Sequence, residues 1–363
     1  MVVQVMSKED LSGDSAEPPP EFFPRHVLLI YSHLERRETG TEDDLLSDLE
    51  TIETAQGIAS ALESIGRSVT PVPVRRVEDA VAAAQEFDPA TTLVFNLCEV
   101  LPGLPDGDSA VLRPLEAMGF VVLGAGPDHL DTTRDKFDVK RMLVARRVST
   151  APYQVFKTGR EPITVPLPAF VKPSCEHGSV GITFDSVVHD EAALRRRVEY
   201  VLDVYRQPAL VEMFLDGREF NISVWDNDPP QVLPLAEMSY AAWADPSQRV
   251  LNFDSKWVAS APEFDDFTVE CPARVDARSA RSIRKLALDT WRAMGCRDFI
   301  RVDMREKAGK FYVIDVNLNP CLAGDAGFFK AARAAGYDYP GMVAHLIEIG
   351  WRRAIDERIL LTA

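Results

Sequence analysis

Short apolar strands and amphipathic helices alternate regularly between residues 26 and 123, and this alternation constrains the fold more than any other feature. The apolar runs occupy residues 26–31, 68–74, 93–96 and 120–123. Apolar residues with helical spacing fill the intervals, at residues 45–62, 80–87 and 112–118. Strands that alternate with helices favour a parallel sheet with helical crossovers. The pattern therefore predicts an N-terminal α/β domain.

The pattern changes after Gly126 and Pro127, where strands dominate and fewer helices separate them. We expect strands at residues 170–172, 181–185, 209–212, 220–225, 232–237, 299–305 and 311–316. We expect helices at residues 135–147, in a long stretch ending near 205, at 274–294 and at 339–355. The fold class is therefore α/β followed by α+β.

These patterns divide the chain into a tail and three folded parts. Residues 1–24 are rich in Ser, Asp, Glu and Pro, so we expect a disordered tail there. We place the N-terminal α/β domain at residues 25–130. A central subdomain with a glycine-containing loop follows at 131–215, and a C-terminal subdomain with a polar hairpin at 216–363.

Charge and composition exclude several classes of partner. The net charge of −16 disfavours nucleic acids and anionic membranes. No run approaches the roughly 20 apolar residues that a membrane span needs, and the N-terminal sequence does not resemble a signal peptide. The five cysteines are scattered and form no C-x-x-C motif, which favours a reduced, cytoplasmic protein. Small molecules remain as the expected ligands.

The most informative motif is a polar hairpin near the C-terminus. Because strand residues alternate between faces, Arg301 and Asp303 share one face, as do Asp315 and Asn317. The two aspartates are symmetric about Gly309, so a hairpin would bring them side by side. Mg²⁺ prefers such oxygen ligands, with phosphate completing the shell. A half-buried hairpin whose polar face meets solvent is the alternative.

Two further segments carry polar groups next to strands. Lys172 ends an apolar strand and is followed by a loop with Gly178 and Gly181, a pattern typical of anion binding because glycine lets backbone N–H groups face an anion. A surface loop with an incidental lysine is the alternative. Glu212 and Glu219 flank a turn after another apolar strand, and buried carboxylates need partners such as a nucleoside or a cation.

These segments occur in one order along the chain: Lys136, Lys172, the glycine loop, the sequence VEMFLDGRE, Lys256, the sequence RVD and the sequence IDVNLNP. This series resembles the ATP-grasp carboxylate–amine ligases, in particular the D-alanine–D-alanine ligase-like branch. The resemblance covers residues from about 96 to 350 well and the first domain loosely. It implies a preATP-grasp-like N-terminal domain followed by a two-subdomain ATP-grasp fold.

The resemblance also implies a role for each site residue. Lys136, Lys172 and Lys256 would contact ATP phosphates, and Gly178 and Ser179 would belong to the phosphate-covering loop. Glu212, Met213 and Leu215 would form the adenine pocket, and Glu219 would bind the ribose. Asp303, Asp315 and Asn317 would hold Mg²⁺, with Mn²⁺ as an alternative metal. Arg301 would steady the acyl phosphate; we count Arg301, Lys256 and Ser179 as catalytic.

The segments around the amino-acid substrates differ from those of D-alanine ligases. The third strand ends in Phe95-Asn96-Leu97-Cys98-Glu99 rather than His-Gly, and residues 321–327 lack the Ser-Leu pair that holds the acceptor carboxylate there. Trp257 replaces the usual Tyr. We therefore expect an ADP-forming ligase that joins a small carboxylate, an amino acid, to an amine. D-alanine–D-alanine ligase proper, a non-catalytic nucleotide-binding regulator and a kinase that forms no amide are the alternatives. A homodimer is the oligomer that the resemblance implies.

Overall fold

The computed structural model describes residues 23–104, 106–240, 243–264 and 266–362, with the side chains of 358–362 excepted. The predicted tail therefore lies outside the described residues, apart from Phe23 and Pro24. The side chain of Phe23 is buried, and the guanidinium of Arg67 lies 4.4 Å from its ring centre.

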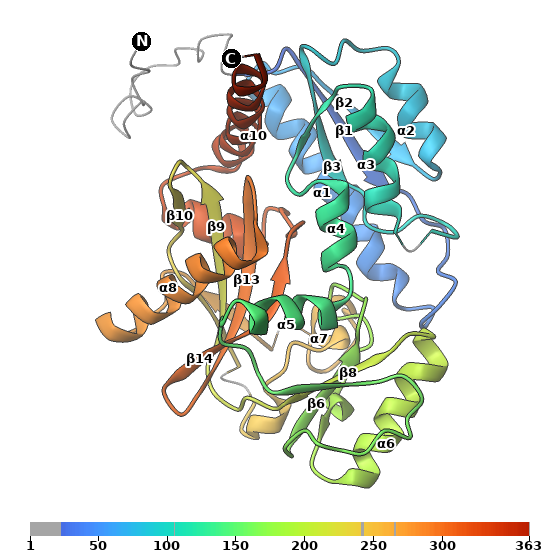
Figure 1. Cartoon of the computed structure of the whole chain (residues 1–363), viewed down its shortest axis with the longest axis vertical. Coiled ribbons are helices and arrows are strands. Elements are labelled where there is room, and N and C mark those ends of the chain that lie inside the picture. The colour runs from blue at the N-terminus through green and yellow to red at the C-terminus, as the bar shows by residue number, and fades with distance from the viewer. Residues whose placement is uncertain (1–22, 105, 241–242, 265, 363) are drawn as a thin grey trace.

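The first part of the chain forms the predicted parallel sheet, with strand order β2-β1-β3-β4 (Figure 1). The strands are β1 His26–Ser32, β2 Val69–Val74, β3 Thr92–Leu97 and β4 Val121–Leu123. The helices are α1 Leu45–Ser64, α2 Val77–Ala84, α3 Gly107–Ala117 and α4 Pro127–Thr133. These are the predicted elements with slightly shifted ends, apart from α4, which the sequence analysis did not predict.

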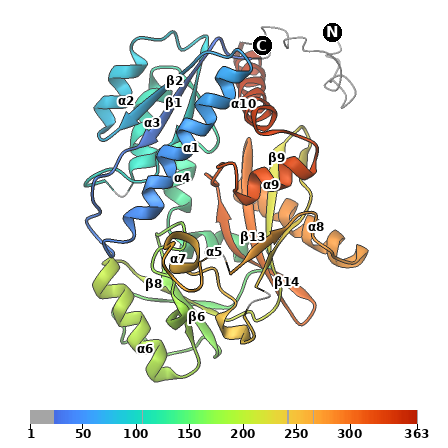
Figure 2. The same cartoon turned by 180° about the vertical axis from the view of Figure 1, so that it is seen from behind.

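Helices cover both faces of this sheet, and successive strand residues point to opposite faces, so both sets of side chains are buried. Leu28 and Ile30 belong to the apolar cluster that includes residues of α2 and α3. Val27 and Leu29 belong to a second cluster with α1 and the C-terminal helix α10, Tyr339–Thr362. Figure 2 shows α1 and α10 beside this sheet. The last helix of the chain thus completes the core of the first domain.

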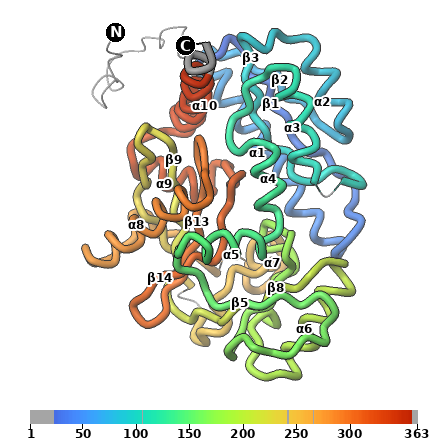
Figure 3. The backbone as a smooth tube through the Cα atoms, viewed as in Figure 1, coloured from blue at the N-terminus to red at the C-terminus, as the bar shows by residue number. Residues whose placement is uncertain are grey.

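The central part forms an antiparallel sheet with order β5-β8-β6-β7. Its strands are β5 Tyr153–Phe156, β6 Ala169–Pro173, β7 Val187–Val188 and β8 Ala209–Met213. Helix α5, Lys136–Ala145, precedes it, and α6, Glu191–Tyr200, continues into a π-helical turn at Val201–Tyr205. Figure 3 shows the backbone running from the first domain through α4 and α5 to this sheet.

The prediction of a strand at residues 181–185 is wrong. Ser179 and Gly181 have positive φ angles of 65° and 72°, so the backbone turns there instead of extending. A Cβ atom at Gly181 would lie 2.5 Å from the ring of Pro173, so only glycine fits this turn. A 3₁₀ turn at Phe184–Ser186 and the short strand β7 follow.

The C-terminal part forms an antiparallel sheet with order β12-β11-β9-β13-β14, and β10 pairs with β9. The strands are β9 Glu219–Asp226, β10 Pro230–Val232, β11 Ala236–Ser239, β12 Thr268–Glu270, β13 Phe299–Lys307 and β14 Lys310–Asn317. Helices α7 Phe253–Trp257, α8 Ala277–Met294 and α9 Gly327–Ala334 join them. The strand predicted at 232–237 is divided into β10 and β11 around Pro234, which lacks the N–H that a strand donates.

The predicted hairpin is present as β13 and β14. Asp303 faces Asp315, as predicted, and Arg301 faces Asn317. Next to the turn, Lys307 pairs with Lys310, and this register, continued unchanged, would place Ile314 opposite Asp303. A bulge between Asp303 and Met304 shifts the register by one residue and thereby brings the two aspartates opposite each other.

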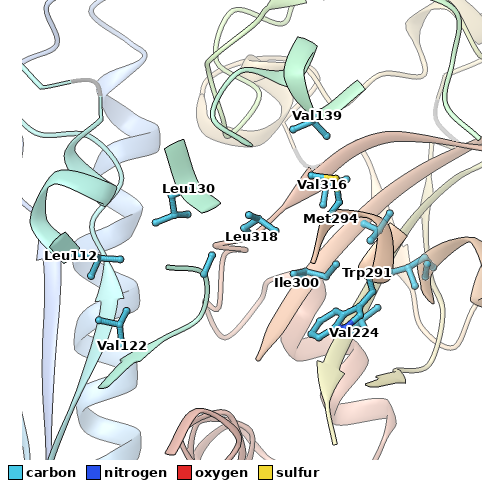
Figure 4. Packing of buried hydrophobic residues seen from close by; sticks show 14 of the residues in the cluster. Leu112, Val122, Leu130, Val139, Val224, Trp291, Met294, Ile300, Val316 and Leu318 are labelled. Atoms are coloured by element: carbon cyan, nitrogen blue, oxygen red, sulfur yellow. The ribbon is translucent and has the colours of Figure 1, made fainter. Parts of the chain in front are cut away.

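One apolar cluster connects the first domain to this sheet. Leu112, Val122 and Leu130 from the first domain belong to the same cluster as Ile300 and Val316 of the hairpin, as Figure 4 shows. This packing holds the hairpin against α3, α4 and the edge strand β4 of the first domain. No helix among the described residues is long and apolar enough to cross a membrane.

Candidate active site

A cavity of about 720 Å³ lies where the central and C-terminal sheets face each other. All the site residues that the sequence analysis proposed line it: Lys136, Lys172, Gly178, Ser179, Glu212, Met213, Leu215, Glu219, Lys256, Arg301, Asp303, Asp315 and Asn317. They come from helices α5 and α7, strands β6, β8, β9, β13 and β14, and the loops after β6 and β8. The structure therefore brings together residues up to 181 positions apart in the sequence.

The hairpin supplies the acidic end of the cavity. Arg301 donates through Nε and Nη2 to the two oxygens of Asp303, at 2.8 and 2.9 Å. Asn317 Nδ2 donates to Asp303 Oδ2 at 3.0 Å, and Asn221 of β9 donates to Oδ1 at 2.8 Å. Asn221 was not proposed from the sequence, because only the pairing of β9 with β13 brings it there.

Asp315 lies directly across from Asp303 and is ionised. Its burial alone would raise the pKa, but the positive charges of Lys136 and Lys172, with a smaller contribution from Lys140, hold the pKa of this carboxyl far below its usual range. Among the described residues, no three His, Cys, Asp or Glu side chains form a complete metal cage. Two carboxylates and an amide oxygen suit Mg²⁺, which keeps several oxygen ligands from water or phosphate.

A buried ion-pair network supports the lysine end of the cavity. The carboxylate of Glu212 lies between Lys140 Nζ at 2.5 Å and Lys172 Nζ at 2.9 Å, and all three side chains are less than a tenth exposed. Lys140 also donates to Thr150 Oγ1 at 2.7 Å and to the carbonyl of Val313 at 3.0 Å. Lys140 was not proposed from the sequence. It is not among the residues that line the cavity, and its ion pair holds the carboxylate of Glu212 in place.

Glu219 is held by two residues that the sequence analysis also missed. Arg305 Nε donates to Glu219 Oε2 at 2.8 Å, and the hydroxyl of Tyr240 donates to the same oxygen at 2.9 Å. Burial and the charge of Glu219 raise the pKa of Tyr240 well above its usual value, so the hydroxyl keeps its proton. The other oxygen of Glu219 makes no hydrogen bond to the described residues, which leaves it able to accept from a ligand hydroxyl.

The glycine loop borders the cavity and is hydrogen-bonded to α7 and to the segment just before it. Trp257 Nε1 donates to the carbonyl of Gly178 at 2.7 Å, and Ser179 Oγ donates to the carbonyl of Leu251 at 2.9 Å. Lys136 Nζ donates to the carbonyl of Glu176. The charge of Lys136 and burial lower the pKa of His177 to about 3, so this imidazole is neutral near pH 7.

Cys321 borders the cavity beside Arg301 and is not an activated nucleophile. Burial and the charge of Glu50 raise the pKa of its thiol to about 12, so it stays protonated. Its Sγ donates to Glu50 Oε1 at 3.4 Å. Glu50 comes from α1 of the first domain, and it is a cavity residue for which the sequence offered no signal.

The matched family model is the C-terminal part of D-alanine–D-alanine ligases, and it covers residues 142–348, more than half of the chain. The chain belongs to this family. Its similar relatives include the D-alanine–D-alanine ligase of Desulforudis audaxviator, 29% identical over 84% of this chain and 94% of the relative. An uncharacterized protein of Sinorhizobium fredii is 28% identical over 84% of both chains.

A solved D-alanine–D-alanine ligase of Bacillus anthracis in complex with ATP has the same fold, with a TM-score of 0.70. It covers 92% of this chain and 99% of its own at 21% identity, so the likeness concerns the fold. Together these matches confirm the predicted ATP-grasp fold and the predicted class of enzyme. The protein is an ADP-forming ligase that uses ATP and Mg²⁺ to join a carboxylate to an amine.

Proposed function

We propose that this ligase activates the carboxylate of an amino acid other than D-alanine and joins it to an amine. The observation that carries the proposal is the meeting of cations and carboxylates in one cavity: Lys136, Lys172, Lys256, Arg301, Asp303 and Asp315. Phosphoryl transfer to a carboxylate brings two anions together, so positioning and charge neutralisation are the main contributions of the protein.

The reaction has two steps. An oxygen of the substrate carboxylate attacks the γ-phosphorus of ATP, and the bond between this phosphorus and the leaving oxygen of ADP breaks. The nitrogen of the amine then attacks the carbonyl carbon of the acyl phosphate and loses a proton, while the C–O bond to phosphate breaks. No bond to a protein side chain is needed, which agrees with the protonated thiol of Cys321.

Different side chains would neutralise different charges in these two steps. Lys136, Lys172 and Lys256 would neutralise phosphate oxygens, and Arg301 would neutralise the oxyanion that develops at the acyl carbon. Mg²⁺, held by Asp303, Asp315 and Asn317, would neutralise the charge of the terminal phosphates. The fastened glycine loop would keep water from the acyl phosphate.

Lys136→Ala and Lys172→Ala should each lower kcat/KM for ATP, because each removes one phosphate-facing cation. A charge-assisted hydrogen bond contributes roughly 1.5–3 kcal/mol, which corresponds to about 10- to 150-fold. The measurement is ADP release at varied ATP concentration. Lys157→Ala, at an exposed position of the same subdomain, is the control. Unchanged ATP kinetics in both cavity variants would contradict the assignment.

D-alanine alone should give little or no dipeptide. Residues 321–327 lack the Ser-Leu pair that D-alanine ligases use, and a site loses its ligand when the polar partners of that ligand are absent. The test is mass spectrometry of reactions that contain ATP, Mg²⁺ and D-alanine. Rapid formation of D-alanyl-D-alanine, on the order of 10 s⁻¹, would favour D-alanine–D-alanine ligase proper instead.

The proposal also covers the cellular compartment and the oligomeric state of the protein. All five cysteines are free thiols, which supports work in the reducing cytoplasm, where ATP is also available. The predicted homodimer stays a prediction, and light scattering of the purified protein tests it.

A further inference from the structure

The loop between β1 and α1, residues 33–44, contacts the central subdomain at two points, and Figure 2 shows it reaching that subdomain near α6. Arg37 Nη2 donates to Glu176 Oε2 at 2.6 Å, and the N–H of Gly40 donates to the carbonyl of Val204 at 3.1 Å. The side chains of Arg37 and Glu176 are only 9% and 11% exposed. Both line a hollow of about 160 Å³ beside α1, and Glu176 also lines the active-site cavity. This ion pair therefore joins two domains next to the site.

The guanidinium of Arg37 is oriented by its own domain. Its Nη1 donates to the carbonyl of Asp44 at 3.4 Å, and its Nε lies 3.7 Å from Asp48 Oδ2. The loop itself can follow only one path here, because Gly40 has a φ angle of 89° and a Cβ atom there would collide with the carboxylate of Asp44. Since a guanidinium is planar, these contacts fix the direction in which its third nitrogen donates to Glu176.

Glu176 connects this ion pair to the rest of the site. Its second carboxylate oxygen, Oε1, accepts from Gln207 Nε2 at 2.8 Å, and its main-chain carbonyl accepts from Lys136 Nζ. Gln207 Oε1 in turn accepts from the N–H of Cys175 at 2.6 Å. The position of Glu176 therefore sets both the start of the glycine loop and the direction of the ammonium of Lys136.

The other half of the glycine loop is bonded to the C-terminal subdomain. Gly178 accepts from Trp257, and Ser179 donates to the carbonyl of Leu251. The loop is thus anchored at one end by the first domain and at the other end by α7 and the segment before it. Loss of the first anchor frees the half of the loop that carries the contact to Lys136.

A buried ion pair is better suited to fix a geometry than to stabilise a fold. The cost of removing both charges from water offsets most of their attraction, so apolar residues of similar volume are often as stabilising. We propose that Arg37 is a positioning residue that acts through Glu176, and that their ion pair holds the glycine loop and Lys136 in the arrangement that phosphoryl transfer needs. This inference rests on the roles proposed above for Lys136 and the glycine loop.

Hydrogen exchange followed by mass spectrometry tests the inference without a carboxylate substrate. With Mg²⁺ and a non-hydrolysable ATP analogue bound, Arg37→Met should raise the exchange rate of the amides at 175–181 by at least about tenfold, the effect of losing one charge-assisted hydrogen bond. Peptides from β9 and β13 should exchange as in the wild type. Arg36→Met, at the neighbouring exposed position, is the matched control. Unchanged exchange in the loop, or an equal increase throughout the chain, would overturn the inference.

A second variant tests the same contact from the other side. Glu176→Gln is almost isosteric and removes the charge that Arg37 contacts, so it should also raise exchange in the loop, and it serves as the test on its own if Arg37→Met does not fold. The double variant should exchange no faster than the faster single variant, because both changes remove one interaction. Additive effects would show that Arg37 acts through another residue and would overturn the inference.

The functional readout is the fate of the acyl phosphate. Hydroxylamine displaces phosphate from it to give a hydroxamate, whereas water displaces phosphate to return the carboxylate. The substrate is the amino acid that gives the wild type the most hydroxamate with ATP and Mg²⁺, chosen from both enantiomers of the common amino acids. The ratio of hydroxamate formed to ADP released should fall in Arg37→Met and in Glu176→Gln, because a misplaced loop admits water. Arg36→Met should keep the ratio of the wild type.

This ratio separates positioning from a general loss of structure. A variant that only contained less folded enzyme would lose both products in proportion and keep the ratio, and a ratio unchanged in both variants would overturn the inference. If the wild type gave no hydroxamate with any amino acid, the proposed function would be contradicted. The exchange of the loop, which requires only the nucleotide, would still decide whether Arg37 positions it.

Discussion

Asp315→Ala should lower ADP release at saturating ATP and substrate by at least roughly 100-fold, the scale of losing one major electrostatic contact in a transition state. Asp315 lies opposite Asp303 on the hairpin, and the lysines around it keep it ionised. Its removal leaves the metal with one carboxylate and takes away a negative charge that Lys136 and Lys172 both stabilise.

The measurement is a coupled ADP assay over a range of Mg²⁺ concentrations. Lys310→Ala, at an exposed position on the same strand, is the control and should behave as the wild type. Full activity of Asp315→Ala at every Mg²⁺ concentration would show that the metal is held elsewhere.

Glu212→Gln should be the most destabilising single change in the site, by roughly 3–5 kcal/mol. The variant leaves two buried lysines, Lys140 and Lys172, without the carboxylate that lies between them. Lys140→Met should cost less, because the pair of Glu212 and Lys172 remains.

Urea unfolding followed by circular dichroism measures this difference. Asp216→Asn is the control, because it breaks the exposed pair with Lys307, which is worth at most about 1 kcal/mol. A loss below about 1 kcal/mol for Glu212→Gln would mean that the lysines find another partner or lose their protons, and that the network does not stabilise this part of the fold.

Local patterns in the sequence were enough to predict the hairpin. Strand periodicity predicted which residues share a face, and their symmetry about Gly309 placed Asp303 opposite Asp315. The bulge between Asp303 and Met304, on which this pairing depends, left no signal in the sequence. The same pattern, continued by two residues, would have identified Arg305 as a third polar residue on that face. The ordered motifs then identified the family, and all the residues they proposed line one cavity.

The parts that could not be predicted depend on contacts between distant segments. Asn221 reaches Asp303 through strand pairing, and Lys140 reaches Glu212 from another element, so neither contact leaves a signal in the local sequence. The short helix α7 did have a signal that was missed, because Asn252 accepts from the N–H of Ser255 as a helix cap. Asp48, near the start of α1, and Glu99, just after β3, line one hollow although 51 positions separate them, and no local pattern indicates this.

Because α10 packs on the first sheet, the core of the first domain is completed only after the last helix of the chain has been synthesised. Arg353 Nη2 donates to the carbonyl of Val122 at 2.8 Å, and Leu346 and Ile347 share a core with Val27 and Leu29. About 216 residues separate the end of β4 from the start of α10. At roughly 5–20 residues per second, a ribosome needs on the order of 10–40 s to add them. During that interval the earliest sheet lacks one of its covering helices, so the nascent chain must keep an apolar surface out of contact with its neighbours.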